Sequence, residues 1–207
     1  MAAPHPPLDL ASVTARLSRL TLPADAGDDA SPRAAVAAIL REGRAVTTGG
    51  GDAEVLLIRR AEHPDDPWSG HMAFPGGRRD EGDRTDLETA VRETREEVGV
   101  DLAAHGALIT RLADVAAVAR GRRTGLTIAP FVFALHAEVS LSFDPAEVSE
   151  ALWAPLGPLA RGEGAGTMRY EVEGQVIVLP CLNVEGHVVW GLTYRMLQLL
   201  FEALGGD

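Results

Sequence analysis

The stretch that decides the fold lies at residues 76–100 and reads GGRRDEGDRTDLETAVRETREEVGV. Thr85 and Glu88 have the spacing of a capping box, and Gly99 stands where a helix would end. These signals predict a helix over about 86–98. The Gly-Gly pair in front of it follows an apolar segment, and glycine allows a backbone to approach a ligand closely.

Three acidic residues, Glu93, Glu96 and Glu97, fall together on this predicted helix. At about 100° per residue they span only about 100° of the helix surface. Their mutual repulsion costs a few tenths of a kcal/mol, roughly, for each pair one turn apart. A solvated acidic face is one interpretation. The glycine turn and the capped helix favour the other, a site for Mg²⁺, which takes carboxylate oxygens together with substrate phosphates.

The segment resembles the Nudix box, a pattern of Gly, five residues, Glu, seven residues and then Arg-Glu-(apolar)-x-Glu-Glu-x-Gly-(apolar). The second half matches at Arg92, Glu93, Glu96, Glu97, Gly99 and Val100. The first half departs from the pattern, because one extra residue lies between Gly77 and Arg92. The mid-box glutamate position therefore falls on Asp83 when counted from the glycine, or on Arg84 when counted from the arginine.

This resemblance implies the fold class and the reaction. The fold is α/β (α+β), with a mixed β-sheet between helices and the box as a loop-helix-loop. It would occupy residues 33–207, after an N-terminal helix and linker over 1–32. The reaction is the hydrolysis of a nucleoside diphosphate linked to another group, by attack of water on phosphorus. Mg²⁺ or Mn²⁺ is the implied cofactor.

The resemblance also implies roles for particular residues. Glu93 and Glu97 would bind the metal with Glu96 and the carbonyl group of Gly77, and Glu96 would assist catalysis. Arg92 would orient the glutamates by ion pairing. The general base is not part of the box. Glu147, six residues before Trp153, has the placement seen in some relatives; Glu150 is the second choice, and a helix start is the alternative interpretation of Glu147.

Further stretches resemble the coenzyme A pyrophosphatase branch of this family, which yields 4′-phosphopantetheine and 3′,5′-ADP. They are residues 69–77, 130–133, 147–153 and 190–197. The loop Glu62–Trp68 departs from that branch, because it is one residue longer and contains no arginine. ADP-ribose, a nucleotide sugar or a nucleoside triphosphate remains an alternative substrate. Ala116 and Ala117 stand where the ADP-ribose and diadenosine polyphosphate branches carry proline and tyrosine. A non-catalytic nucleotide sensor is the second alternative, and the intact set of three acids argues against it.

Arginines supply the expected substrate contacts. Arg59 and Arg60 end an apolar run, and strand alternation places only one of them on the site face. Arg122 and Arg123, with Arg120, form the only basic cluster, which is interpreted as an anion clamp or as a solvated hairpin tip. Gly76 completes the expected substrate-binding set.

The composition limits the function further. The chain has 207 residues and a net charge of -11, which argues against binding to nucleic acid or to anionic membranes. It contains no lysine, so a Schiff base is excluded. The start of the sequence lacks a secretory pattern and no apolar run is long enough to span a membrane, so a cytoplasmic location is expected. The apolar face of the last helix and the habit of the family suggest a homodimer.

Hydrophobic periodicity predicts the remaining elements. We expect helices over 8–20 and 190–204, a β-hairpin formed by 34–40 and 55–59, long strands over 108–119 and 127–137, and shorter strands over 152–155 and 175–179. A glycine-rich loop over 157–166 is expected between the two shorter strands.

Overall fold

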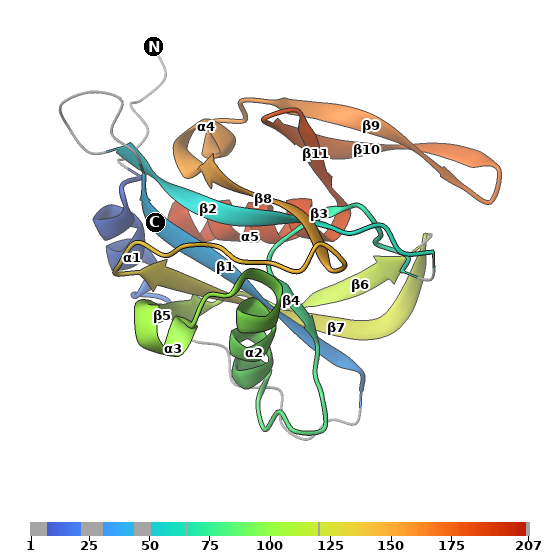
Figure 1. Ribbon diagram of the computed structural model, residues 1–207. Helices are drawn as coiled ribbons and strands as arrows, with labels where there is room; N and C mark the ends of the chain where they lie inside the picture. Colours follow the sequence, from blue (N-terminus) through green and yellow to red (C-terminus); the bar gives the residue numbers. More distant parts are fainter. Residues whose placement is uncertain (1–7, 22–30, 44–50, 65, 120, 206–207) are drawn as a thin grey trace, which may run out of the picture.

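The computed structural model describes residues 8–21, 31–43, 51–64, 66–119 and 121–205. Its main sheet runs in the order β3-β2-β1-β7-β5, with β4 paired to β1, β6 to β7 and β8 to β2 (Figure 1). The strands are β1 (Arg33–Gly43), β2 (Gly51–Arg60), β3 (Met72–Ala73), β4 (Gly76–Arg78), β5 (Gly106–Arg111), β6 (Val115–Ala119), β7 (Arg122–Leu135) and β8 (Val148–Pro155).

Strand β1 lies at the centre of the sheet and makes it mixed. It pairs in parallel with β7, from Arg33 opposite Thr127 to Leu40 opposite Ala134, and antiparallel with β2. Its side chains alternate between two buried clusters. Val36, Ala38 and Leu40 belong to one cluster, and Ala35, Ala37 and Ile39 belong to the other. A strand buried on both faces reads as a continuous apolar run, which is the pattern of residues 34–40.

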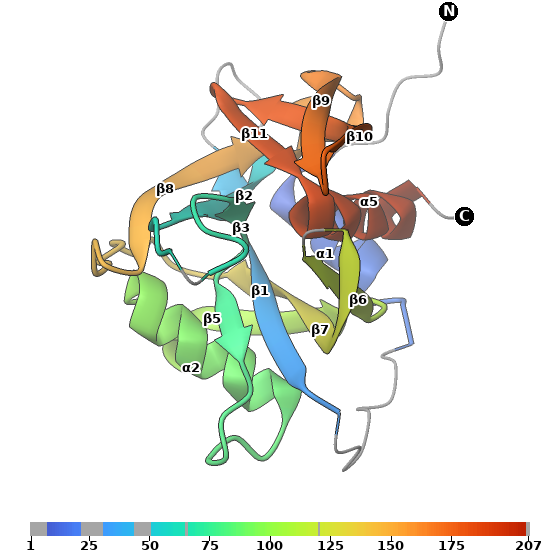
Figure 2. The same ribbon diagram turned by 90° about the vertical axis from the view of Figure 1, so that its right-hand side faces the viewer.

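Helices cover both faces of the sheet, as predicted (Figure 2). Helix α2 (Asp86–Val98) packs on one face, and α1 (Leu10–Leu17) and α5 (Gly191–Gly205) pack on the other; a short α3 (Leu102–His105) follows α2. Val13 and Leu17 of α1 join the same core as α5, so the N-terminal helix packs directly on the sheet. The domain boundary at residue 33 stays a prediction. Among the residues described, no helix is both long and apolar enough to cross a membrane.

A second, three-stranded sheet follows β8. It contains β9 (Ala165–Val172), β10 (Gln175–Val184) and β11 (His187–Trp190), and the short helix α4 (Leu156–Ala160) precedes it. The glycine-rich segment 157–166 was expected to be a loop, but it includes most of α4 and the start of β9. The prediction was wrong because β9 is defined by pairing with β10 along its whole length, from Val172 opposite Gln175 to Ala165 opposite Leu182.

The expected strand over 108–119 is broken into β5 and β6. The break contains Asp114, whose carboxylate accepts a hydrogen bond from Arg33 Nη2 at 3.0 Å and pairs with Arg111 Nη2 at 2.5 Å. Arg33 also pairs with Asp86 at the start of α2. Arg33, Asp86, Arg111 and Asp114 thus form a largely buried cluster of ion pairs. These contacts interrupt the strand between β5 and β6.

The start of the box, strand β4, pairs with β1, because β1 changes partners along its length. Residues Ala34–Val36 pair with β4, and β2 takes over from Leu40. Between them, the Ala37 N–H donates a hydrogen bond to the Pro75 carbonyl at 2.8 Å. Gly76 has a φ of 151°, and a Cβ there would lie 2.3 Å from the carbonyl oxygen of Ala35. Only glycine fits this approach.

Candidate active site

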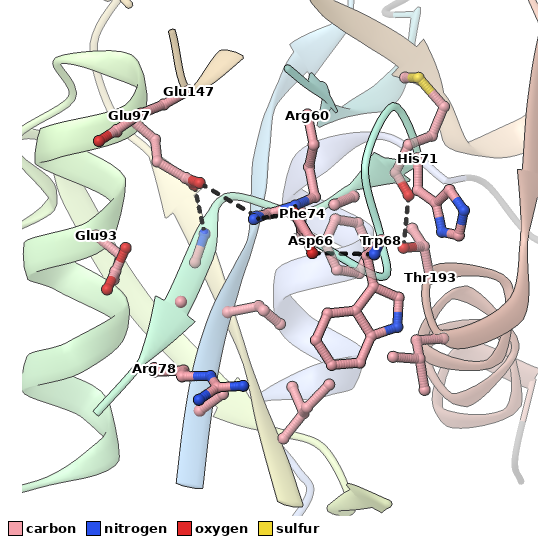
Figure 3. Close-up of a pocket in the computed structure, with 18 of the residues that line it drawn as sticks. Arg60, Asp66, Trp68, His71, Phe74, Arg78, Glu93, Glu97, Glu147 and Thr193 are labelled. Atoms are coloured by element: carbon pink, nitrogen blue, oxygen red, sulfur yellow. Dashed lines mark hydrogen bonds and ion pairs between the residues drawn. The ribbon is translucent and has the colours of Figure 1, made fainter. Parts of the chain in front are cut away.

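A cavity of about 660 Å³ lies between α2, the loop before β3 and the start of α5. Figure 3 shows glutamates on one side of it and Trp68 and His71 on the other. The acidic side is formed by Glu93, Glu96, Glu97 and Glu147. The apolar part of the lining includes Trp68, Met72, Phe74, Leu126, Ile128, Leu192 and Met196. The cavity can therefore hold a cation and an anionic group beside an apolar one.

Glu97 is the most deeply buried of the box glutamates, with a side chain only 7% exposed. Its Oε2 accepts a hydrogen bond from the Gly76 N–H at 2.7 Å, and its Oε1 lies 3.7 Å from Nη1 of Arg60. Burial raises the pKa of Glu97 to about 7, against the lowering effect of the Gly76 N–H and Arg60. A carboxylate in this environment gains from a bound cation or a proton.

Glu93 lies against the backbone of Gly77. A Cβ on Gly77 would come within 2.4 Å of Oε2 of Glu93, so this carboxylate occupies space that is open only because residue 77 has no side chain. Burial raises the pKa of Glu93 as well. Glu96 is more open, with 55% of its side chain exposed, and it also faces the cavity.

Arg92 holds this acidic set together. Its Nη1 donates to Glu93 Oε1 at 2.9 Å and to Glu96 Oε2 at 2.8 Å. Its Nη2 donates to Asp83 Oδ2 at 2.8 Å, and the Arg92 hydrogen bond lowers the pKa of Asp83 to about 2. Asp83, one of the two positions considered for the mid-box acid, therefore holds the arginine that pairs with Glu93 and Glu96. The orienting role of Arg92 stays a prediction.

The donor set fits a hard divalent cation. Its side-chain donors are all carboxylate oxygens, and Gly77 leaves room at Glu93. Glu97 is buried and Glu93 is half-buried, and burial raises the pKa of both. Among the described residues, no three His, Cys, Asp or Glu side chains are already gathered tightly enough to form a metal cluster. The carboxylates would therefore have to close around the ion.

The predicted substrate-binding arginines are divided by the structure. Arg60 lines the cavity, whereas Arg59 turns away from it and pairs with Glu62 at 3.6 Å, as strand alternation requires. Neither Arg122 nor Arg123 lines the cavity, and Arg122 pairs with Glu173 in the turn between β9 and β10.

Glu147 lines the cavity beside Glu97, and Glu150 does not. The Glu147 N–H donates to the Asp144 carbonyl at 2.9 Å in a turn that leads into β8, so this segment is not a helix start. Glu150 lies 3.2 Å from Nε2 of His187 on β11. Of the two candidates for the base, only Glu147 faces the acidic side of the cavity.

Arg78 was not among the residues that the sequence suggested. Its side chain points into the cavity (Figure 3), and within the described part of the chain its guanidinium has no hydrogen bond or ion pair. Arg60 and Arg92, the other arginines of the cavity, are both paired with carboxylates. The only signal in the sequence was its position directly after the Gly-Gly pair.

The far side of the cavity is fixed by contacts between distant segments. Thr193 of α5 donates a hydrogen bond to the Met72 carbonyl of β3 at 2.8 Å. The ring of His71 packs against Trp190, with 4.7 Å between the ring centroids, and burial lowers the pKa of His71. His71 is therefore a packed, neutral side chain at the cavity wall.

The mixed sheet between helices, together with the loop-helix-loop at the glutamates, is the arrangement that the resemblance to the Nudix family implied. The NUDIX domain profile matches residues 31–172, and the chain belongs to the Nudix family. An uncharacterized protein of Schizosaccharomyces pombe is 43% identical over 107 residues, which cover 51% of this chain and 32% of that protein.

Nudix hydrolase 22, chloroplastic, of Arabidopsis thaliana is 30% identical over 155 residues, which are 71% of this chain and 48% of that protein. The chain thus spans a third to a half of the length of these two relatives. A MutT/nudix family protein from Enterococcus faecalis shares the fold, with a TM-score of 0.54 and 18% identity over 94% of this chain and 67% of that one.

Proposed function

We propose that this protein is a metal-dependent pyrophosphohydrolase that cleaves the diphosphate of a nucleoside diphosphate linked to another group. One observation carries the proposal: the buried Glu97 and the half-buried Glu93 lie against the Gly76–Gly77 backbone at one side of a substrate-sized cavity. Two negative charges held close together away from water are unfavourable, and a divalent cation bound with the diphosphate would compensate the charges of both glutamates.

Five residues of the cavity, and the metal that they would hold, have a part in this reaction. Bound Mg²⁺ or Mn²⁺ would neutralise the diphosphate and lower the pKa of the attacking water. Glu93 and Glu97 would hold the ion with Glu96, and Arg92 would keep Glu93 and Glu96 in place. Glu147 would take the proton of the water whose oxygen bonds to phosphorus, while the anhydride P–O bond breaks and its electrons leave with the departing phosphate.

Coenzyme A, cleaved to 4′-phosphopantetheine and 3′,5′-ADP, is the substrate we propose first. Its extra phosphate offers an anion to Arg78, and the apolar lining suits its uncharged arm. ADP-ribose, a nucleotide sugar or a nucleoside triphosphate is the alternative within the family. A nucleotide sensor without activity is the alternative outside catalysis.

A product assay over these substrates and NADH, with Mg²⁺ and with Mn²⁺, tests the proposal. We expect coenzyme A to be cleaved fastest, and Glu97→Gln to lose all but a trace of turnover at saturating metal. A Glu97→Gln variant with more than about a tenth of normal activity would remove Glu97 from the metal site. Binding of a nucleotide without metal and without cleavage would favour the sensor.

Glu147→Gln tests the base. We expect turnover to fall by about 10²-fold, because an amide cannot accept the proton. Glu150→Gln is the matched control, since Glu150 lies three residues further along the chain, on β8 and outside the cavity, and its rate should stay close to normal. The opposite ranking of the two variants would assign the base to Glu150.

The proposal includes a cytoplasmic location and a homodimer. The apolar face of α5, from which a dimer was expected, is buried within the chain itself: Met196, Leu197, Leu200 and Leu204 all belong to its core. A dimer would therefore have to use another surface, and light scattering of the purified protein will report the mass.

A further inference from the structure

The loop that joins β2 to β3 is organised around the carboxylate of Asp66. One oxygen, Oδ2, accepts hydrogen bonds from Nε and Nη2 of Arg60 at 2.9 and 2.8 Å. The other, Oδ1, accepts from the Trp68 backbone N–H at 2.9 Å. A single side chain thus connects the last residue of β2 to Trp68 (Figure 3).

Arg60 connects this loop to the acidic side of the cavity. Its Nη1 lies 3.7 Å from Oε1 of Glu97, so its guanidinium stands between the carboxylates of Asp66 and Glu97. The planar fork of arginine can serve two carboxylates at once in a defined geometry. The position of the loop is therefore set relative to the box.

Trp68 is the part of the loop that reaches the cavity. Its indole Nε1 donates to the Val118 carbonyl of β6 at 3.3 Å, and its ring packs against the core while lining the cavity. Figure 3 shows the ring on the side opposite Glu93 and Glu97. Asp66 fixes the backbone of Trp68, and β6 fixes its ring.

We propose that Asp66 is a positioning residue for substrate recognition. Its carboxylate holds the backbone amide of Trp68 and is itself held by Arg60, so that the Trp68 ring forms the wall that receives the apolar group attached to the diphosphate. This inference rests on the proposed function. Asp66 and Trp68 both lie in the loop between β2 and β3. A tryptophan ring offers a large, rigid surface to a flat or apolar group.

The first test needs no turnover. The emission of Trp68 is obtained as the difference between each protein and the same protein carrying Trp68→Phe. In Asp66→Asn, the amide keeps an acceptor for the Trp68 N–H but presents a donor to Arg60; in Asp66→Ala, both links are lost. We expect the Trp68 emission to shift to longer wavelength in both variants, more in Ala, as water reaches the ring.

Glu62→Gln is the matched control. It weakens the neighbouring arginine–carboxylate pair, in which Glu62 of the same loop lies 3.6 Å from Arg59 near the end of β2, and neither residue lines the cavity. The Trp68 emission should not change in this variant. An unshifted spectrum in Asp66→Asn, or an equal shift in Glu62→Gln, would overturn the positioning role.

The second test is kinetic, with the best substrate of the panel. Trp68→Ala and Asp66→Asn should each raise KM, by about tenfold for the loss of an aromatic contact, with little change in kcat. The double variant should be no worse than Trp68→Ala, because Asp66 acts through Trp68. Additive effects, or a fall in kcat at constant KM, would contradict the proposal.

The two tests separate this inference from the proposed function. If the wild type cleaves a substrate but the Trp68 emission does not depend on Asp66, the inference alone fails. If no substrate is cleaved, the proposed function fails and the recognition role falls with it, while the spectra still decide whether Asp66 positions Trp68.

Discussion

The buried carboxyl group of Glu97 can be stabilised either by a proton or by a bound cation. Its pKa of about 7 means that the metal-free site is partly protonated near neutral pH. At the proposed metal site, protons and metal ions would therefore compete for this carboxylate, and the acidic side of the cavity should bind metal more weakly as the pH falls.

The stability of the metal-free protein should consequently depend on pH through Glu97. The pKa rises from its usual 4.5 to about 7 on folding, so the folded state holds more protons than the unfolded state between these values. Stability should fall as pH rises across this range, by at most about 3 kcal/mol from this residue.

Urea unfolding at pH 5 and pH 8, in the presence of a chelator, measures this effect. Glu97→Gln carries no charge and should lose less stability between the two pH values than the wild type does. Mg²⁺ should restore the wild type at pH 8 but not the variant. Parallel pH profiles for the two proteins would show that Glu97 is not the responsible group.

Arg78 is the residue of the cavity whose charge is available to a substrate. Arg78→Ala should raise KM for coenzyme A by about tenfold or more, because a charge-assisted contact is lost. Dephospho-coenzyme A lacks the extra phosphate, so its KM should change less. Arg78→Lys, which keeps the charge, is the control; equal effects on both substrates would place the contact at the diphosphate instead.

At the scale of elements, strand β4 contains two glycines that are needed for different reasons, Gly76 and Gly77. Gly76→Ala places a Cβ 2.3 Å from the Ala35 carbonyl oxygen, on a backbone that cannot move without disturbing β1. Gly77→Ala places its Cβ 2.4 Å from the carboxylate of Glu93, which can swing away. The first substitution should destabilise the fold, and the second should leave the protein folded with a displaced Glu93, the proposed metal ligand.

Thermal unfolding and Mg²⁺ titration of the two variants distinguish these outcomes. We expect Gly76→Ala to be destabilised by several kcal/mol, roughly the cost of strain at a special backbone position with a clash. Gly77→Ala should keep most of its stability and bind Mg²⁺ more weakly. Normal metal binding by Gly77→Ala would show that Glu93 does not need its present position.

Some elements are predictable because their signals are local. Helix α2 runs from Asp86 to Val98 as predicted, since Thr85 accepts from the Glu88 N–H at 3.1 Å and Gly99 ends the helix with a φ of 72°. The common face of the three glutamates follows from the same helix. The hairpin of β1 and β2 is confirmed for a similar reason, since its strands are adjacent in sequence.

Other features depended on partners that a sequence pattern does not reveal. The break before β6 is made by Asp114 joining Arg33, 81 residues away in the chain. The position of Arg78 in the cavity and the wall formed by Trp68 also depend on segments distant in sequence. The mixed sheet between helices was inferred from the resemblance and is confirmed, but the contacts that close the cavity were not predictable.

For the whole molecule, the buried cluster around Asp86 ties the start of α2 to β1 and β5. Asp86 is 1% exposed and lies 2.5 Å from Arg33 and 4.0 Å from Arg111, whose side chains are 5% and 4% exposed. The hydrogen bond to Asp86 raises the pKa of Arg33. Removing one partner of such a cluster leaves buried charges without compensation.

Asp86→Ala should therefore destabilise the protein by about 3–5 kcal/mol in urea unfolding. Glu202→Ala is the control, because it breaks a pair with Arg195 in which both side chains are more than half exposed, and it should cost less than about 1 kcal/mol. Similar losses of unfolding free energy in the two variants would mean that burial does not increase the contribution of this cluster to stability.

The parallel pairing of β1 with β7 also has a consequence for how the protein is made. During synthesis, Arg33 cannot pair with Thr127 until residue 127 has left the ribosome, so the central strands β1 and β7 pair late. Loop closure over such a distance is slow, and an apolar strand without its partner is prone to aggregate. We expect the yield of soluble protein to depend on the speed of synthesis and on chaperones more than on the stability of the finished domain.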